Sequence, residues 1–383
     1  MLAETIKTLD RLVAFPTVSK DSNLDIVHYL SQRLEQHGAK VEIIKDATGQ
    51  KASLWATLGP QNTGGGIVLS GHTDVVPVTD QPWTSDPFQM TDRDGRLYGR
   101  GTCDMKGFIA ACLSVAPLLA AKARETPVHF SFTHDEETGC LGAARLIEIL
   151  RDRPHKPAIA VIGEPTEMRV IEGHKGCYEY TAEFTGLEGH GSSPDLGVNA
   201  VEYATRYVTR LLELRDELKT RPPQGSRFQP PWTTLNIGAL HGGVAHNVIV
   251  PKASVAWEMR PVVVADADFV KTDINTYANT VLLPAMQAVH PDASINVVVE
   301  GEVAGLEPMD TNAARDLVAS LTGANGADVV PFGTEAGLFQ SLGIDCVVCG
   351  PGSIEQAHKA DEYIEIAQLQ ACLDMLVGLA NRL

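Results

Sequence analysis

The sequence predicts a two-domain α/β protein in which a larger domain with a mainly parallel sheet is interrupted by a smaller α+β domain. Three observations support this fold class. The chain has 383 residues, more than one hydrophobic core usually organises. Short apolar runs alternate with helix-like stretches in residues 1–176 and again in residues 305–383, as in strands joined by helices. In residues 177–304 the strand-like runs alternate apolar and polar residues instead.

The first segment begins with two predicted helices. Apolar residues at helical spacing run from Leu2 to Leu12 and from Ile26 to Leu34, and Gly38 is placed to end the second helix. Buried strands and helices then alternate, with strands at 67–69, 128–133 and 159–162 and helices at 108–121 and 143–150. Strand, helix, strand in this order favours a mainly parallel sheet.

The middle segment has a different pattern. Tyr178, Tyr180 and Phe184 alternate with more polar residues, as on a half-buried strand. Further strands are predicted at 234–240, 254–259 and 295–299, helices at 199–218 and 266–283, and a proline-rich loop at 221–232. This pattern predicts a small α+β domain with an antiparallel sheet. The α/β pattern then resumes at 312–321, 346–349 and 366–379, so residues 305–383 should complete the first domain.

Composition excludes some classes of partner. The formal net charge of −17 argues against nucleic acid, because phosphate binding needs clustered Lys and Arg. We expect no membrane partner, since no apolar run approaches the ~20 residues of a membrane helix, and we see no secretory signal at the N-terminus. Seven scattered cysteines do not suggest a disulfide framework, so we expect a reducing, cytoplasmic location. The acidic surface fits simple solubility, or attraction of a cationic substrate or metal ions.

Potentially reactive side chains follow several of the predicted strands. In open parallel sheets such residues collect just beyond the carboxyl ends of the strands. The candidates are His72, Asp74, Asp104, Glu136, Glu137 and Glu164, with His358 in a late loop. Their like charges would repel one another unless a cation lies among them. Histidines with carboxylates are the ligand set that Zn²⁺ favours, so the sequence predicts a metal site.

Four motifs at these positions carry a family resemblance. They are Gly71–Pro77 (GHTDVVP), Gly99–Gly107 (GRGTCDMKG), Asp135–Gly139 (DEETG) and Gly163–Thr166 (GEPT). On these motifs, and along its whole length, the chain resembles the M20 family of dinuclear zinc peptidases and deacylases, and within it the acetylornithine deacetylases. Relatives that hydrolyse carbamoyl groups carry a histidine where Glu164 stands, which argues against that activity.

The resemblance implies two Zn²⁺ ions per chain, with Co²⁺ or Mn²⁺ as possible substitutes. His72 and Glu164 would bind one ion, and Glu137 and His358 the other. Asp104 would bridge both ions. Asp74 would orient His72 through its other ring nitrogen, and Glu136 would be the general base rather than a ligand.

The resemblance also implies residues that contact the substrate. The motif Gly186–Pro194 matches a family loop whose histidine stabilises the oxyanion and often comes from the partner subunit, which assigns that role to His190. Arg260 matches a carboxylate-binding arginine, and Asn247 a position near the substrate. A glycine-flanked loop would line the pocket with Gly333, Thr334 and Glu335. Of these, Glu335 could meet a side-chain ammonium such as that of ornithine.

The predicted activity is therefore metal-dependent hydrolysis of an Nα-acyl amino acid, with N-acetyl-L-ornithine as the first candidate. Desuccinylation of a diaminopimelate derivative, aminoacylase and carboxypeptidase activity use the same ligands. A catalytically inactive binding homologue is a remote alternative, because every ligand candidate and Glu136 are present. We expect a homodimer that pairs through residues 177–304, which would also act as a lid.

The cysteines suggest no competing chemistry. Cys346 and Cys349 lie in an apolar strand, where an odd offset puts their sulfurs on opposite faces. Cys103 adjoins Asp104 but lacks a base nearby in sequence, so a packing role is expected rather than that of a nucleophile.

Overall fold

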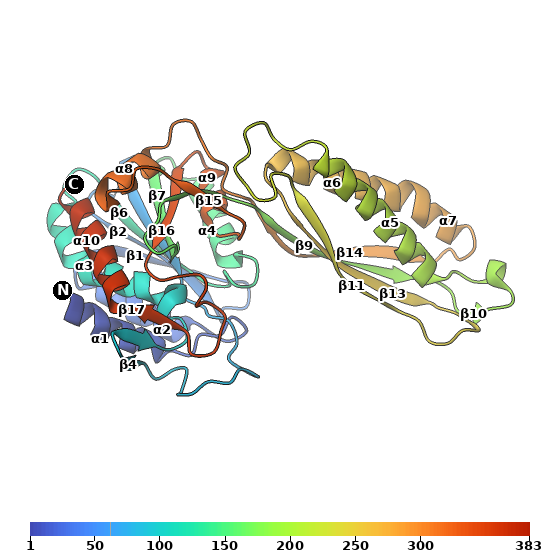
Figure 1. Ribbon diagram of the computed structural model, residues 1–383, viewed down its shortest axis with the longest axis horizontal. Helices are drawn as coiled ribbons and strands as arrows, with labels where there is room; N and C mark the ends of the chain where they lie inside the picture. The colour runs from blue at the N-terminus through green and yellow to red at the C-terminus, as the bar shows by residue number, and fades with distance from the viewer. Residues whose placement is uncertain (62) are drawn as a thin grey trace. The chain divides into compact units, whose positions relative to one another are not determined.

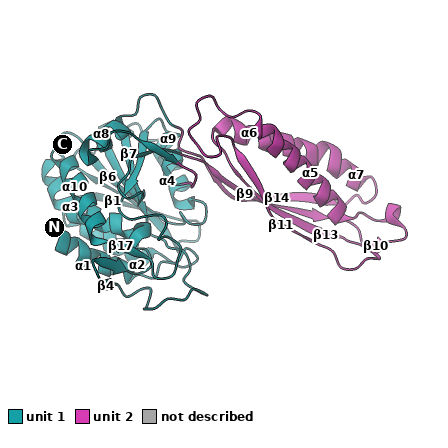
Figure 2. Cartoon of the chain, in the orientation of Figure 1, with its two compact units in different colours: residues 1–173, 308–329, 334–383 teal, residues 174–307, 330–333 magenta. Residues whose placement is uncertain are grey.

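The computed structural model describes residues 1–61 and 63–383, which form two compact units (Figure 2). Unit 1 comprises residues 1–173, 308–329 and 334–383, and unit 2 comprises residues 174–307 and 330–333. The second unit thus interrupts the first. The observed junctions lie near those expected at 176 and 305, and the short return of residues 330–333 to unit 2 was not anticipated.

Unit 1 is built on an eight-stranded sheet with the order β1-β2-β6-β3-β7-β16-β8-β15. Its central strands are parallel: β6 (Val128–Thr133), β3 (Ile67–His72), β7 (Ile159–Pro165) and β16 (Asp345–Gly350). Antiparallel pairing adds β1 (Lys40–Lys45), β2 (Ala52–Leu58) and β8 (Ile171–His174), and β15 (Asp328–Val330) is the last strand in the order. The predicted α/β class with a mainly parallel sheet is confirmed.

Helices cover both faces of this sheet (Figure 1). One face carries α1 (Leu2–Val13), α2 (Leu24–Glu35), α3 (Gly107–Lys122), α8 (Ala313–Thr322) and α10 (Ile366–Ala380). The other carries α4 (Leu141–Arg151) and α9 (Ala336–Gln340). The apolar stripe predicted for the first helix is buried in the structure, with Leu9 and Leu12 in the core. Both faces being covered explains why the central strands are continuously apolar.

The most apolar helix lies inside unit 1. An irregular turn, η1 (Thr102–Lys106), leads into α3. Together they make a 21-residue segment whose most apolar window has a mean hydropathy of 1.5. By length and composition this helix could cross a membrane, which the sequence analysis did not expect. However, 78% of its apolar window is buried within the fold, where α3 packs against α1 and α10. A core helix has this character.

Several strands were not predicted. Strand β2, which lies next to the edge strand β1, contains two alanines and a serine, which have weak strand preference. A separate three-stranded sheet, with the order β17-β5-β4, also escaped prediction because each strand has three residues. These strands are β4 (Thr91–Arg93), β5 (Arg96–Tyr98) and β17 (Tyr363–Glu365).

Unit 2 is an antiparallel sheet covered by helices on one face. The strand order is β11 (Thr234–Gly242), β13 (Lys252–Arg260), β9 (Cys177–Thr185) and β14 (Ser294–Val303). The covering helical segments are α5 (Ala200–Lys219), α6 (Val264–Tyr277), η3 (Ala278–Leu282) and α7 (Leu283–Gln287). Tyr180 stacks on Trp257 with ring centroids 4.5 Å apart, and Phe184 meets Tyr207 edge-on. The alternation of buried and exposed residues along β9 matches the predicted half-buried strand.

A small extension completes unit 2. Strand β10 (Gly189–His190) pairs with β12 (Val248–Ile249), and the short helix η2 (Pro194–Leu196) follows β10. Since β12 directly precedes β13, this extension continues from the beginning of β13.

The contact between β7 and α3 gives a stability prediction. A methyl group added at Gly163 would overlap the ring of Phe108, so Gly163→Ala should lower the free energy of unfolding by about 1–3 kcal/mol through overpacking. Urea unfolding of the metal-free protein, followed by a probe of unit 1, measures the change. Gly326→Ala is the matched control, because nothing lies within 4 Å of an added methyl there. Equal midpoints for both variants would contradict the packing described for α3.

Candidate metal centre

Side chains from five segments of unit 1 converge beyond the carboxyl ends of the parallel strands. His72 ends β3, Glu164 lies near the end of β7, and Glu137 follows β6. Asp104 comes from the turn η1, and His358 from the loop between β16 and β17. The fold therefore brings together residues that are up to 286 positions apart, the separation of His72 from His358, at one edge of the sheet.

Asp104 lies between the two histidines. Its Oδ1 is 2.9 Å from His72 Nε2, and its Oδ2 is 3.4 Å from His358 Nε2. Glu164 Oε1 is 3.8 Å from His72 Nε2, and Glu137 Oε2 is 3.0 Å from His358 Nε2. Each carboxylate oxygen of Asp104 thus faces a different histidine and a different glutamate partner. This is the division into two ligand sets that the family resemblance implies.

These atoms fit a pair of divalent cations. Ligand atoms bound at about 2.0–2.2 Å around a tetrahedral ion lie roughly 3.3–3.6 Å from one another, and the four distances above, from 2.9 to 3.8 Å, bracket this range. In addition, Glu137 Oε1 and Glu164 Oε1 are buried and have no hydrogen-bond partner among the described residues. Buried carboxylate oxygens are costly to leave unpaired, and a cation supplies the missing partner.

The electrostatics of the cluster point the same way. Burial, opposed by His72 and reinforced by Glu137, raises the pKa of Glu136 to about 8. Burial and the Asp104 carboxylate raise the pKa of Glu164 well above its usual value. Hydrogen bonds with Asp104 and Glu137 raise the pKa of His358 to about 10. The carboxylates are therefore stable in their ionised form only if a positive charge lies close to them.

Asp74 acts through two different groups. His72 Nδ1 donates to the main-chain carbonyl of Asp74 at 2.9 Å, while the carboxylate lies farther away at 3.7 Å. The carboxylate instead accepts from Ser19 Oγ at 2.7 Å and from the amides of Glu136 and Glu137 at 3.2 and 3.4 Å. Asp74 thus contacts the other ring nitrogen of His72, as predicted, but through its main-chain carbonyl. Its carboxylate holds the turn that presents Glu136 and Glu137.

Glu362 is a residue whose role the sequence analysis did not assign. Its carboxylate accepts from the amides of Gly101, Cys103 and Asp104 at 2.9–3.0 Å and from Arg100 at 2.7 Å. Arg100 and Glu362 are each only 1% exposed. Because Glu362 follows His358 by four residues, it fixes the turn carrying Asp104 to the loop carrying His358. An acid so close in sequence to a histidine ligand candidate was the available signal.

Cys103 has the expected packing role. Its thiol donates to the carbonyl of Ser353 at 3.3 Å, and burial, together with the Glu362 carboxylate, raises the pKa of the thiol well above its usual value. A thiol that stays protonated is a poor nucleophile. Cys346 and Cys349 are also buried, and their sulfurs contact Ile344 and Met375 respectively rather than each other.

Four of the predicted substrate residues belong to unit 2: His190, Asn247, Arg260 and Gly333. His190 in β10 pairs with Val248, and the amide of Gly191 donates to the carbonyl of Asn247 at 2.7 Å, so His190 and Asn247 are neighbours. Arg260 is the last residue of β13, whereas His190 and Asn247 lie near the beginning of that strand. Its guanidinium contacts Glu258 at 2.7 Å and is 31% exposed.

The predicted loop at 333–335 is divided between the units. Gly333 belongs to unit 2, and Thr334 begins the return to unit 1, where its hydroxyl accepts from the amide of Ala336 at the start of α9. Glu335 is 1% exposed, and its carboxylate accepts from Ser70 and Thr133 on β3 and β6. The structure does not support the predicted contact of Glu335 with a substrate ammonium. Glu335 instead joins the two strands that position His72 and Glu137.

Comparison with known proteins identifies the class. Residues 68–382 match the model of peptidase family M20/M25/M40, and the chain belongs to this family of metallohydrolases. The family implies a dinuclear metal site. Two groups of side chains in this cluster lie close enough to hold an ion: His72, Asp104 and Glu137, and His72, Glu136 and Glu164.

One relative of this chain is acetylornithine deacetylase of Shigella sonnei, which is 34% identical over 377 residues, covering 97% of this chain and 95% of the relative. Among solved structures, a metallo-carboxypeptidase of the M20 family from Sulfolobus solfataricus gives a TM-score of 0.75 at 18% identity, covering 98% of each chain. A tripeptidase from Staphylococcus aureus gives 0.72 at 20% identity, covering 100% of this chain and 99% of the other. These two structures support the fold.

Glu362 gives a prediction for metal binding. In Glu362→Gln, an amide NH₂ replaces one oxygen that accepts main-chain hydrogen bonds, so the turn carrying Asp104 loses support. We expect metal affinity to fall about 10–100-fold, measured by competition with a chromophoric chelator, and the absorption spectrum of the Co²⁺-loaded protein to change. Glu365→Gln, an exposed position in β17, is the control. Unchanged affinity and spectrum in a folded Glu362→Gln protein would exclude this role.

Proposed function

We propose that this chain hydrolyses the amide bond of an Nα-acyl amino acid, with N-acetyl-L-ornithine as its substrate and L-ornithine and acetate as products. The observation that carries the proposal is the pair of histidine–glutamate sets on either side of Asp104. A carboxylate oxygen of Glu136 lies within 4.8 Å of the ligand atoms of His72 and Glu164, and we assign Glu136 to proton transfer rather than to metal binding. The choice of substrate is supported by 34% identity to an acetylornithine deacetylase along nearly the whole chain.

Five residues would hold the two ions: His72, Asp104, Glu137, Glu164 and His358. Their nitrogen and carboxylate donors favour Zn²⁺, with Co²⁺ or Mn²⁺ as substitutes. When bound, such ions polarise an amide carbonyl and make water a better nucleophile at neutral pH.

Glu136 supplies the proton transfers. The carboxylate of Asp74 accepts a hydrogen bond from the amide of Glu136, so the turn that carries this glutamate is held in place. The Glu136 carboxylate removes a proton from the attacking water as the C–O bond forms. It then delivers that proton to the leaving nitrogen as the C–N bond breaks, which releases a neutral amine and a carboxylic acid. The remaining acid proton passes to the amine at neutral pH, so the final products are a carboxylate and an ammonium group, and Glu136 is again a carboxylate.

Arg260 is the proposed anchor for the substrate α-carboxylate. Its planar guanidinium suits a carboxylate, and Glu258 already holds it through one oxygen at 2.7 Å. A partly exposed arginine fixed on one side by an acid is pre-oriented for a second acid on the other side.

The activity is tested with a panel of Nα-acyl amino acids that includes acetylornithine, succinyl-diaminopimelate and simple acetyl amino acids. We expect metal-dependent release of acetate from acetylornithine, with a fall of about 10²–10⁴-fold in kcat for Glu136→Gln and bound metal unchanged. Glu125→Gln, an exposed position of unit 1, is the control. Hydrolysis of a different panel member, and not of acetylornithine, would keep the proposed reaction but assign a different substrate. No hydrolysis by the metal-loaded protein would reject the proposal.

We also propose that the protein acts as a homodimer through unit 2, with His190 acting on the substrate bound by the partner. His190 pairs with Val248, which precedes the first residue of β13, whereas Arg260 is the last residue of that strand. The nine residues of β13 span about 26 Å at roughly 3.3 Å per residue. An acyl amino acid is only about 7 Å long, so one chain's His190 and Arg260 cannot both touch it. Exposed Leu196 and Val244, near the β10–β12 extension, suit an interface.

Mixed dimers test the origin of His190. His190→Ala and Glu136→Gln proteins should each be nearly inactive alone. After unfolding and refolding as an equal mixture, activity should return to about a quarter of wild type, because half the dimers then carry one complete site of two. If His190 acts within its own chain, both sites of every mixed dimer stay defective, and the mixture remains inactive.

A further inference from the structure

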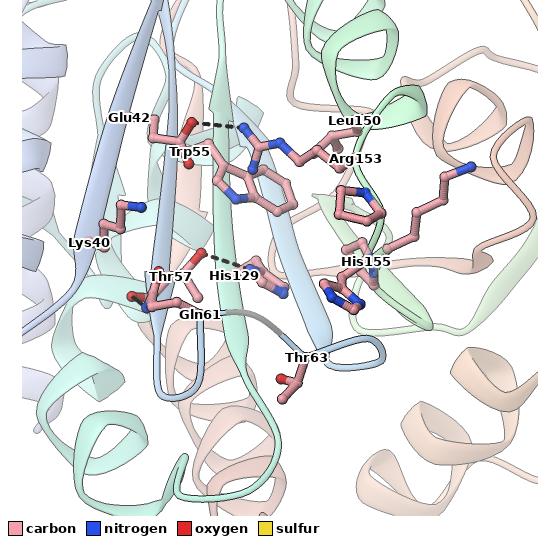
Figure 3. Close-up of a pocket in the computed structure, with 13 residues that line it drawn as sticks. Lys40, Glu42, Trp55, Thr57, Gln61, Thr63, His129, Leu150, Arg153 and His155 are labelled. Carbon is pink, nitrogen blue, oxygen red and sulfur yellow. Dashed lines mark hydrogen bonds and ion pairs between the residues drawn. The ribbon is translucent and has the colours of Figure 1, made fainter.

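Unit 1 contains a cavity whose lining includes none of the proposed catalytic or metal-binding residues. It has a volume of about 280 Å³, and Figure 3 shows its walls on β1, β2, β6 and the segment that follows α4. The key residues are Lys40, Trp55, His129, Arg153 and Lys156. This volume is close to the lower end of the range for sites that bind small molecules.

The cavity lies at the edge of the sheet opposite the metal centre. His129 is the second residue of β6, and it pairs in register with Val68 of β3. His72, four residues farther along β3, lies about 13 Å away at roughly 3.3 Å per residue. Lys156 precedes β7, whose far end carries Glu164. A molecule in this cavity would therefore not contact the reacting groups.

The residues that line the cavity carry a net positive charge, whereas the chain as a whole is negatively charged. Lys40, Arg153 and Lys156 supply three cations, and Glu42 is the single acid among the described residues of the wall. These residues have a local excess of two positive charges in a protein of net charge −17. Arg153 pairs with Glu42 at 2.8 Å. Within residues 1–61 and 63–383, no hydrogen bond or ion pair is found for the ammonium groups of Lys40 and Lys156.

His129 adds an ordered donor to these cations. Its ring stacks on Trp55 with centroids 4.9 Å apart, and its Nδ1 lies 2.9 Å from the hydroxyl of Thr57 (Figure 3). When the hydroxyl donates to Nδ1, the proton of the neutral ring is on Nε2, which becomes a donor. Burial and the charge of Arg153 lower the pKa of His129 to about 4, so the ring is neutral near pH 7. The side chains of the cavity thus offer several donors and, apart from the paired Glu42, little accepting carboxylate.

We propose that this cavity binds a small acidic molecule, whose carboxylate or phosphate oxygens contact Lys40, Lys156 and His129. Arg153 forms the side wall and stays paired with Glu42, so it shapes the site without being the primary contact. Charge-assisted hydrogen bonds to two ammonium groups and a fixed ring donor make an oxyanion the matching ligand. Because the site is remote from the metal centre, its occupation stabilises unit 1 rather than competing with the substrate.

Thermal unfolding of the metal-loaded protein tests this proposal with two probes, inorganic phosphate and succinate, against sodium chloride at equal ionic strength. We expect a saturable rise in Tm with at least one probe, because a ligand that binds only the folded state raises Tm with concentration. In Lys40→Ala/Lys156→Ala the apparent affinity should fall by about tenfold or more. Lys7→Ala/Lys20→Ala removes two exposed cations elsewhere in unit 1 and should respond as wild type does.

The pattern of Tm shifts distinguishes the possible ligands and shows whether the cavity binds them. A response to phosphate alone identifies a phosphate-bearing ligand, and a response to succinate alone identifies a carboxylate-bearing one. A shift that survives the Lys40/Lys156 change but disappears in His358→Ala would belong to the metal centre and overturn the proposal, as would the absence of any saturable shift. Circular dichroism and acyl hydrolysis verify that the double variant is folded, and Lys156→Gln provides a milder test of the same contact.

Discussion

The crowding of buried acids around Asp104 is the constraint on which the rest of unit 1 depends. Three glutamates and an aspartate with two histidines cannot gather in a buried place unless positive charge balances them. The surrounding fold resists this repulsion with neutral donors. Main-chain amides hold Asp74 and Glu362, and the hydroxyls of Ser70 and Thr133 hold Glu335. The parallel strands supply the alignment, and these hydrogen bonds supply the fixed geometry.

The acids of the centre therefore fall into two groups with different partners. Asp104, Glu137 and Glu164 face the histidines, and two of their oxygens have no hydrogen-bond partner among the described residues. Asp74, Glu335 and Glu362 are saturated by donors from the protein. A carboxylate that binds a metal ion needs lone pairs that accept no hydrogen bond from the protein. A carboxylate that positions other residues uses its lone pairs to accept such hydrogen bonds. This difference in hydrogen bonding separates the two groups where residue type alone cannot.

Features that depend on local sequence could be predicted, whereas the hydrogen-bonding partners of the buried acids could not. The order of strands and helices, the mainly parallel sheet and the candidates at the strand ends were predictable, since apolar periodicity and position after a strand are local properties. The supporting acids were not. Glu335 looked like a pocket residue because glycines flank it, and only the packing of β3 against β6 shows that it is buried. The short strands β4 and β5 were missed because three residues carry no periodic signal.

The insertion of unit 2 sets an order of events during synthesis. Residues 174–307 leave the ribosome before β16 and α10 exist, although β16 pairs with β7 in the middle of the sheet of unit 1. Unit 2 is continuous except for residues 330–333, so it can fold while unit 1 still exposes one side of β7. His358 is the last of the five proposed metal ligands to be synthesised. The nascent chain thus has no complete metal centre until nearly all of its length has been made, which delays hydrolytic competence until both units can form.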